Sequence, residues 1–178
     1  MRRPLKLHPH SVCAAVTGIE VEVTRPAGGS LILSYAATGT IGDLLLPQAA
    51  APTRANELWR HTCFEAFVMD AAGEAYYEFN FAPSTRWAVY RFERYRSGMQ
   101  AVTEIEPPQI GGQSTQDRHT LRATLSLPDP QAGRSLRLGL AAVIEEKNGN
   151  TSFWALAHSP GRPDFHHADG FALELPRG

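Results

Sequence analysis

The chain has 178 residues, of which 43% are hydrophobic and 20% are charged, and its formal net charge is −1. This length and balance favour one domain with a sizeable core. The small net charge excludes a general attraction to nucleic acid or to an anionic membrane, and no apolar run approaches the roughly 18 residues that a membrane-spanning helix needs.

The N-terminus and the cysteines bear on where the protein works. The first residues, MRRPLKLHPH, begin with arginines as an export signal does, but no apolar segment follows them. The two cysteines, Cys13 and Cys63, match no metal-binding or disulfide pattern, which favours two free thiols. We therefore expect a cytoplasmic protein with no nucleic-acid or membrane partner. No pattern in the sequence defines an oligomeric state.

Short runs of β-branched, aromatic and alternating apolar residues follow one another along the chain, with Gly, Pro and Asn between them. Such runs are typical of strands. In chain order the predicted strands are Ile19–Thr24, Leu31–Tyr35, Trp59–Met69, Ala75–Phe81, Arg86–Phe92, His119–Leu127, Leu136–Ile144, Thr151–His158 and Gly170–Leu175. The ranges Gly39–Arg54 and Gly98–Gln116 are predicted loops, and Ser84–Arg96 is the best candidate for a helix.

The connections between these runs favour antiparallel pairing. The first two strands are close enough to form a hairpin, the segment DAAG at Asp70–Gly73 is a hairpin-like turn, and Asn148-Gly149 is a strong signal for a tight turn. With several short strands and no long helix, the sequence predicts an all-β fold. We expect two antiparallel sheets packed as a β-sandwich of jelly-roll type, forming a single domain over residues 1–178.

Alternation along two neighbouring predicted strands separates a core face from a polar face. The core face carries six apolar or aromatic side chains: Phe64, Ala66, Val68, Tyr77, Phe79 and Phe81. The opposite face gathers Glu65, Glu78 and Asn80, with Trp59 at its edge. This combination favours binding of a sugar, whose hydroxyls need polar partners and whose C–H face packs on an aromatic ring. The alternative is an ordinary solvated face of a sheet.

The same two glutamates allow a second interpretation. Two carboxyl groups that face each other across a sugar, roughly 5–10 Å apart, form the catalytic set of a glycoside hydrolase. Many binding modules also carry acidic pairs. A glycoside-processing enzyme that uses Glu65 and Glu78 is therefore the alternative to a non-catalytic binding module.

The stretch HSPGRPDFHHADGF, residues 158–171, concentrates side chains that can bind metals or ligands. Its spacing matches no zinc motif, whereas Asp164, Asp169 and backbone carbonyls would suit calcium. We expect an ordered loop in which His158, Asp164 and His166 line or brace the ligand pocket, and calcium stays open as a cofactor.

The run RWAVYRFERYR, residues 86–96, interleaves arginines with aromatic residues. Such a pattern occurs where single-stranded nucleic acid is bound. Here Glu93 interrupts the run and the chain is net acidic, which favours a packed strand with a solvated arginine edge.

Three segments carry a resemblance to a known family: LWRHTCFEAFV, YYEFNFAPSTRWAVYRFERYRSGM and FWALAHSPGRPDFHHADGFAL. They resemble the DOMON-like bacterial proteins, a group similar to family 9 carbohydrate-binding modules, over residues 58–175. The resemblance implies a β-sandwich that binds a ligand without catalysis. In the sugar-binding relatives two tryptophans clamp a terminal sugar, and the matching positions here are Trp59 and Trp154. The positions that match polar ligand contacts are Glu65, Glu78 and Asn80.

The sequence departs from the pattern of that family at several points. The sugar-binding relatives are usually appended to secreted enzymes, whereas we expect this chain to act alone and without an export signal. A basic residue is more usual at the position of Glu78. Other DOMON domains bind haem through Met and His, and although Met69 and Met99 are present, their spacing does not identify axial ligands. A haem-binding domain is therefore a further alternative.

Overall fold

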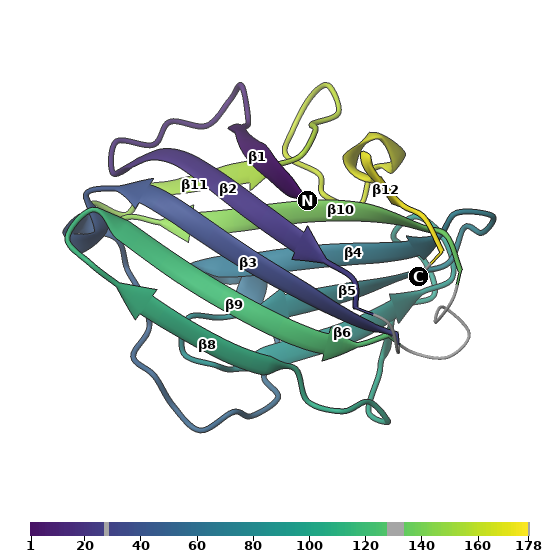
Figure 1. The fold of residues 1–178 in the computed structure, drawn as a ribbon. Helices are drawn as coiled ribbons and strands as arrows, with labels where there is room; N and C mark the ends of the chain where they lie inside the picture. The colour runs from purple at the N-terminus through teal and green to yellow at the C-terminus, as the bar shows by residue number, and fades with distance from the viewer. Residues whose placement is uncertain (27–28, 128–133, 178) are drawn as a thin grey trace.

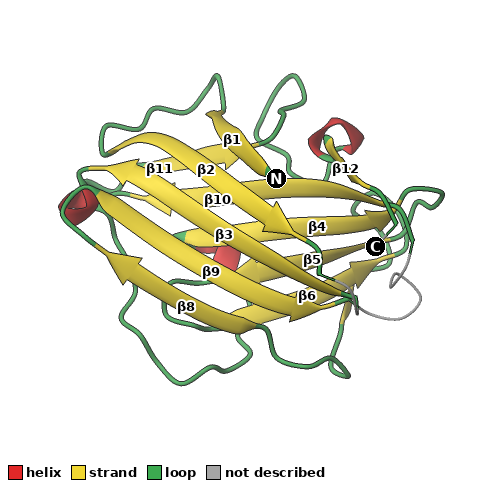
Figure 2. Cartoon of the chain, viewed as in Figure 1, coloured by secondary structure: helices red, strands yellow, loops and turns green. Residues whose placement is uncertain are grey.

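The computed structural model describes residues 1–26, 29–127 and 134–177, and it is built almost entirely of strands (Figures 1 and 2). The strands are β1 (Arg2–Leu7), β2 (Val16–Thr24), β3 (Ser30–Gly39), β4 (Cys63–Asp70), β5 (Tyr76–Phe81), β6 (Trp87–Phe92), β7 (Gln100–Ala101), β8 (Gln109–Ser114), β9 (Arg118–Ser126), β10 (Leu136–Glu145), β11 (Thr151–Ala155) and β12 (Leu173–Leu175). Three single-turn 3₁₀ helices complete the described elements: η1 (Ile41–Asp43), η2 (Leu58–Arg60) and η3 (Ala168–Gly170). None of the helices in these ranges has the length and apolar character to cross a membrane.

The strands form one continuous curled sheet in which every paired strand runs antiparallel to its neighbour. Its order is β7-β6-β5-β4-β10-β11-β1-β2-β3-β9-β8, and β12 adds to β10 beside this path. Strand β1 joins the two halves, because residues Arg2–Leu5 pair with β2 and Lys6 and Leu7 pair with β11. In Figure 1 the half that contains β2, β3 and β9 passes obliquely over the half that contains β4, β5 and β10. The Tyr35 hydroxyl of β3 donates a 2.8 Å hydrogen bond to the carbonyl of Glu65 in β4, directly across this interface.

The main core lies between the two halves of the curled sheet. On β2, β3 and β9, buried and more exposed residues alternate, because only one face of each strand is covered. The core face of β4 and β5 contributes Phe64, Ala66, Val68, Phe79 and Phe81, and Tyr77 packs against this cluster. The face predicted from alternation is therefore the core face.

A second, smaller apolar cluster covers the opposite side of β4, β5, β6 and β10. It consists of Phe67, Tyr76, Ala88, Tyr90, Phe92, Ala141, Ala155 and Phe171, with Leu58, Met69 and Phe165 partly buried against it. The segment that carries residues 159–171 therefore packs over the outer face of the sheet. Because both faces of β4 and β5 are covered, these strands are buried almost throughout, and their outward side chains lie in an enclosed environment.

The structure confirms the all-β, antiparallel prediction and both hairpins, β2–β3 and β4–β5. The sequence predicted two separate sheets, whereas hydrogen bonding through β1 makes one continuous order. Strand β1 was missed, β7 and β8 lie inside a predicted loop, and the helix considered for Ser84–Arg96 is wrong, since β6 occupies most of that range. Strand β4 begins at Cys63, so Trp59 lies in η2 and not on the strand.

Candidate ligand-binding site

A cavity of about 700 Å³ opens on the outer face of the sheet, over β4, β5, β6 and β10. Residues of η2, of the segment after β6 and of the segment before β12 complete its lining. The lining residues are Asn56, Glu57, Trp59, Glu65, Glu78, Tyr90, Phe92, Arg96, Met99, Ala101, Val143, Phe153, Pro163, Phe165 and His166. The volume falls in the usual range for small-molecule sites.

Two glutamates form part of the cavity floor, on adjacent strands. Glu65 of β4 pairs across the sheet with Asn80, and Glu78 of β5 pairs with Phe67, so the two carboxyls occupy diagonal positions on one face. Glu65 is only 3% exposed and Glu78 only 5%. Burial of two acidic side chains so close together is costly unless each finds a partner.

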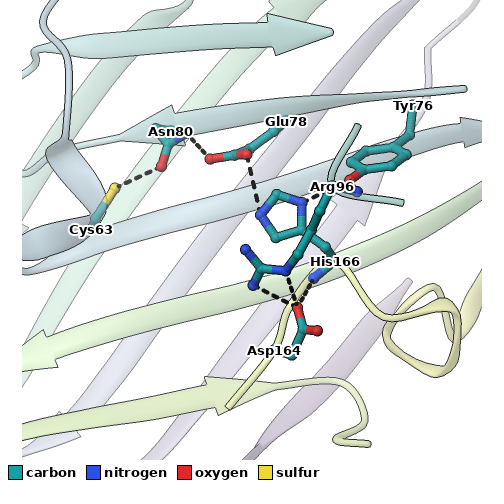
Figure 3. A network of polar contacts seen from close by, with 7 residues as sticks. All are labelled: Cys63, Tyr76, Glu78, Asn80, Arg96, Asp164 and His166. Atoms are coloured by element: carbon teal, nitrogen blue, oxygen red, sulfur yellow. Dashed lines mark hydrogen bonds and ion pairs between the residues drawn. The ribbon is translucent and has the colours of Figure 1, made fainter. Parts of the chain in front are cut away.

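Glu78 has such partners and Glu65 does not. The Nδ2 group of Asn80 donates to Oε1 of Glu78 at 2.7 Å, and the Cys63 thiol lies 3.6 Å from Oδ1 of the same asparagine, as Figure 3 shows. By contrast, Oε1 of Glu65 is buried without a hydrogen-bond partner among the described residues. This unsatisfied oxygen belongs to a side chain that lines the cavity.

His166 is held by contacts through both ring nitrogens. Nδ1 lies 2.8 Å from the Tyr76 hydroxyl, and Nε2 lies 3.6 Å from Oε2 of Glu78 (Figure 3). The backbone N–H of Arg96 donates to the same Tyr76 hydroxyl at 3.2 Å. These contacts are all satisfied when Tyr76 donates its hydrogen to Nδ1 and Nε2 carries the ring proton towards Glu78.

An ion pair behind His166 connects two segments that close the cavity. Nη2 of Arg96 lies 2.8 Å from Oδ1 of Asp164, and Nε of the same arginine lies 3.2 Å from that oxygen. Asp164 also accepts hydrogen bonds from the Tyr95 hydroxyl and from the backbone N–H of His166. Arg96 adopts a left-handed backbone conformation with φ of 49°, as does Glu57 with φ of 59°. Both of these non-glycine residues line the cavity, where such strain is held by surrounding contacts.

Burial and mutual repulsion decide the electrostatics of the two glutamates. Burial, and then the neighbouring Glu78 carboxylate, raise the pKa of Glu65 well above its ordinary value. Burial also raises the pKa of Glu78, although the hydrogen bond from Asn80 and the charge of Arg96 oppose the shift. Both carboxyls therefore hold their protons to higher pH than a solvent-exposed glutamate does.

The pKa values of His166 and Asp164 are lowered, whereas those of the two glutamates are raised. Burial, helped by the positive charge of Arg96, lowers the pKa of His166 to about 4, so its ring is neutral at pH 7. Burial alone would raise the pKa of Asp164, but hydrogen bonds from Arg96 and Tyr95 outweigh it and lower that pKa overall. The Arg96–Asp164 pair is thus ionised and balanced, whereas the two glutamates have no cation of their own.

Aromatic rings form much of the cavity wall. Tyr90 and Phe92 come from β6, Phe153 from β11, Phe165 from the final loop and Trp59 from η2. Trp59 is 47% exposed although it is a large ring, so its face is available at the entrance. The site offers flat apolar surface on its sides and carboxyl groups at its base.

The structure brings together four of the eight residues that the sequence singled out. Trp59, Glu65, Glu78 and His166 line the cavity. Asn80 and Asp164 stand one layer behind, where they hold Glu78, Arg96 and the backbone of His166.

His158 and Trp154 lie elsewhere. Nε2 of His158 is 2.8 Å from the Lys6 carbonyl, where it ties the loop to β1 outside the cavity lining. Trp154 belongs to the main core, is 5% exposed and donates its indole N–H to Ser152. The expectation that it faces Trp59 across a cleft is wrong, because the pairing Trp154–Ala142–Phe64 puts its side chain on the core face. Phe153, its neighbour in sequence, lines the cavity instead.

Sequence reasoning missed most of the wall: Tyr90, Phe92, Arg96, Met99, Phe153 and Phe165. Alternation along β6 contained part of the signal, since Tyr90 pairs across the sheet with Glu78 and so shares its face. Arg96 and Phe165 carry no such periodic signal, because they lie in loops whose path depends on tertiary packing.

The residues do not fit the cofactors left open by the sequence. Nowhere in the described ranges do three or more His, Cys, Asp or Glu side chains cluster as a metal site requires. The carboxylate of Asp164 is already occupied by Arg96 and Tyr95, which disfavours calcium there. Haem would need a ring nitrogen free to bind iron, but both ring nitrogens of His166 contact protein groups, although Met99 also lines the cavity.

A second hollow, of about 640 Å³, lies on the outer face of β2, β3, β8 and β9. Its lining is largely charged and polar, with Glu20, Arg118 and Arg122 among its members. None of the buried polar atoms left without a partner in the described residues belongs to its lining. The first cavity is therefore the better candidate for a built binding site.

Fold and cavity together define an all-β protein with an aromatic-walled, acidic cavity on the outer face of a curled sheet. No protein-family description and no curated protein sequence matches the chain. A solved structure from Bacteroides uniformis, named as that of a candidate carbohydrate-binding protein, has a TM-score of 0.66 at 11% identity, over 95% of this chain and 83% of that one.

Two further matches are structures of a family 9 carbohydrate-binding module from Caldicellulosiruptor kristjanssonii. The complex with glucose has a TM-score of 0.50 at 11% identity and covers 88% of this chain and 76% of that one. The complex with cellotriose has a TM-score of 0.52 at the same 11% identity and covers 88% and 74% of the two chains. The protein thus shares its fold with carbohydrate-binding modules.

Proposed function

We propose that the protein is a non-catalytic carbohydrate-binding module that holds a sugar in the cavity over β4, β5 and β6. The observation that carries this proposal is the lining itself, in which aromatic rings surround two buried carboxyl groups. Sugars need that combination, since their C–H faces pack on rings and their hydroxyls need strong, fixed hydrogen-bond partners.

The position of each group suggests its part in binding. The exposed ring of Trp59 packs against the face of the sugar at the entrance. Glu65 and Glu78 hydrogen-bond its hydroxyls at the base, and the buried oxygen of Glu65 gains a contact that no described residue supplies. Asn80 and Asp164 act as positioning residues, because they hold Glu78 and Arg96 in place.

The shared fold supports this proposal. The structures from Caldicellulosiruptor kristjanssonii contain glucose and cellotriose, so a sheet of this kind can carry a sugar site. We further propose that residues 1–178 form one domain of the DOMON-like β-sandwich type. Two unpaired thiols suit the reducing environment of the cytoplasm, which we propose as its location.

A glycoside-processing enzyme is the alternative, because Glu65 and Glu78 lie on one face of adjacent strands. Such an enzyme needs one carboxyl that is protonated and another that is ionised. Here burial raises the pKa of both groups, which opposes that division of roles. Incubation with aryl glycosides separates the two functions, since any protein-dependent hydrolysis that Glu65→Gln abolishes would establish the enzyme.

Tryptophan fluorescence provides a direct test of sugar binding. Trp87 and Trp154 are each 5% exposed, whereas Trp59 is 47% exposed. We expect glucose or cellotriose to shift the emission of the protein to shorter wavelength by covering Trp59, and Trp59→Phe to abolish that shift. By calorimetry, Trp59→Ala should weaken binding by about fivefold or more, because a ring contact of this kind contributes about 1 kcal/mol or more.

Leu45→Ala provides a matched control, since Leu45 is also an exposed apolar side chain and lies outside the cavity lining. It should bind sugar as the parent protein does. If no sugar binds, or if Trp59→Ala binds as tightly as the parent, the proposed function is wrong.

A further inference from the structure

When the two carboxyls of the cavity are ionised, they leave an excess of negative charge that a neutral sugar does not balance. Glu65 is only 3% exposed, and its buried Oε1 has no hydrogen-bond partner among the described residues. Glu78 lies beside it, and its hydrogen-bond donor, Asn80, is neutral. A buried carboxyl without a donor or a counter-ion is strongly unfavourable, so this arrangement lowers the stability of the fold.

Arg96 in the lining and Arg60 beside Trp59 are already committed to other partners. Arg96 is paired with Asp164 at 2.8 Å, and Arg60 is paired with Glu57 at 2.8 Å. Burial lowers the pKa of His166 to about 4, so it supplies no charge near neutrality. Once these pairs are formed, Glu65 and Glu78 are the acidic groups of the lining that lack a cationic partner.

The walls suit a cation as well. Tyr90, Phe92, Phe153, Phe165 and Trp59 surround the carboxyls, and the face of an aromatic ring attracts a positive charge. Rings around a carboxylate are a combination that recognises ammonium groups, because the rings exclude water while the carboxylate supplies the counter-charge.

We propose that the cavity binds a sugar that carries a protonated amine, with the ammonium group against Oε1 of Glu65 and between the aromatic walls. This inference rests on the proposed function and specifies its ligand class. An amino sugar provides both the C–H faces that the rings need and the cation that the glutamates lack. A neutral sugar supplies only the first of these.

The test compares sugars that differ in one group. Calorimetry at pH 6.5 would measure the dissociation constants of glucosamine and of 6-amino-6-deoxyglucose against those of glucose and N-acetylglucosamine. At least one of the two amines should bind about tenfold or more tightly than glucose, since a charge-assisted hydrogen bond of about 1.4 kcal/mol corresponds to that factor. N-acetylglucosamine, which keeps the nitrogen without its charge, should show no such preference.

Glu65→Gln tests the residue that carries the proposal. We expect the ratio of the glucose and amine dissociation constants to fall towards one in this variant, whatever its affinity for each sugar. Glu20→Gln removes the same charge from an exposed position on β2, outside the cavity lining, and should preserve the ratio of the parent.

The outcomes separate this inference from the proposed function. If glucose binds and neither amine binds more tightly, the amine preference is wrong and sugar binding stands. If no sugar of either kind binds, both proposals are wrong. If the preference for an amine persists in Glu65→Gln, the assignment to Glu65 is overturned.

Discussion

Glu65 is placed where it lowers the stability of the folded protein. It is buried, it lies beside a second carboxyl and one of its oxygens has no partner among the described residues. Groups of this kind are retained at binding sites because the ligand supplies what the fold leaves unsatisfied. A change that removes the carboxyl should therefore affect stability and binding in opposite directions.

The pH dependence of stability should reveal this residue. Because its pKa is raised in the folded state, the folded protein binds more protons than the unfolded chain above the ordinary pKa of 4.5, and stability falls as pH rises towards the raised value. Glu65→Gln has no such titration. The free energies of unfolding would be measured with urea between pH 4.5 and 8. We expect the value for Glu65→Gln minus that for the parent to increase with pH, by up to about 1.4 kcal/mol per pH unit.

Glu20→Gln again controls for the loss of one negative charge, and its stability should follow that of the parent across the same pH range. Glu78, whose pKa burial also raises, is present in all three proteins, so the comparison reports Glu65 together with its repulsion of Glu78. A Glu65→Gln curve that runs parallel to the parent would show that this carboxyl is not buried and unpaired as described.

At the scale of strands, the sequence predicted most of the fold because alternation is a local signal. Phe64 and Glu65 are adjacent in the chain, so their opposite faces follow from strand geometry alone. The face of Trp154 does not follow from local alternation, because it depends on the register of Trp154 with Ala142 and of Ala142 with Phe64. No local pattern gives the register of strands so distant in sequence.

Loops account for the rest of what the sequence could not predict. Trp59 lies in the single turn η2, which interrupts a run of residues that otherwise looks like strand. Arg96 reaches the cavity because its backbone turns at a φ of 49° and its side chain pairs with Asp164, 68 residues away. Such contacts exist only after the sheet has formed. Four of the fifteen lining residues were therefore recognised from the sequence, and the loop-borne part of the wall was not.

The pairing between the end of β3 and the start of β2 requires a glycine at position 39. Gly39 has a φ of 150°, and a Cβ atom at this position would lie 2.0 Å from the Ala15 carbonyl oxygen. We expect Gly39→Ala to lower the free energy of unfolding by about 2 kcal/mol or more, because the backbone must shift to relieve the overlap. Urea denaturation monitored by circular dichroism would measure the loss.

Gly111→Ala in β8 is the control, since a Cβ atom there would meet no heavy atom within 4 Å. Its stability should stay within about 0.5 kcal/mol of the parent. Equal losses in the two variants would mean that the close approach at Ala15 is not what requires glycine.

At the scale of the whole molecule, the two halves of the sheet are coupled through β1 and through the core. All three tryptophans lie in or beside the half that contains β4, β6 and β11, while the far-ultraviolet circular dichroism signal comes from both halves. The Tyr35 hydroxyl joins β3 to Glu65 of β4 across the core. These features predict that the halves unfold as one unit.

Tyr35→Phe tests that coupling. Removal of one buried hydrogen bond should cost about 1–2 kcal/mol, and the urea midpoints from tryptophan fluorescence and from circular dichroism should move down together. Two separate midpoints, in the parent or in the variant, would show that the halves unfold independently.

Alternate residues of β4 and β5 face the core and the cavity, and this separation matters for engineering a new binding specificity. Positions 64, 66, 79 and 81 build the interior, while positions 65 and 78 line the cavity. A library restricted to the second set, with position 90 on the neighbouring strand, would explore new specificities and leave the hydrophobic interior untouched. Insertion of a single residue in either strand would reverse the faces of the residues that follow it. Carboxyl groups would then point into the core and phenylalanines into the cavity.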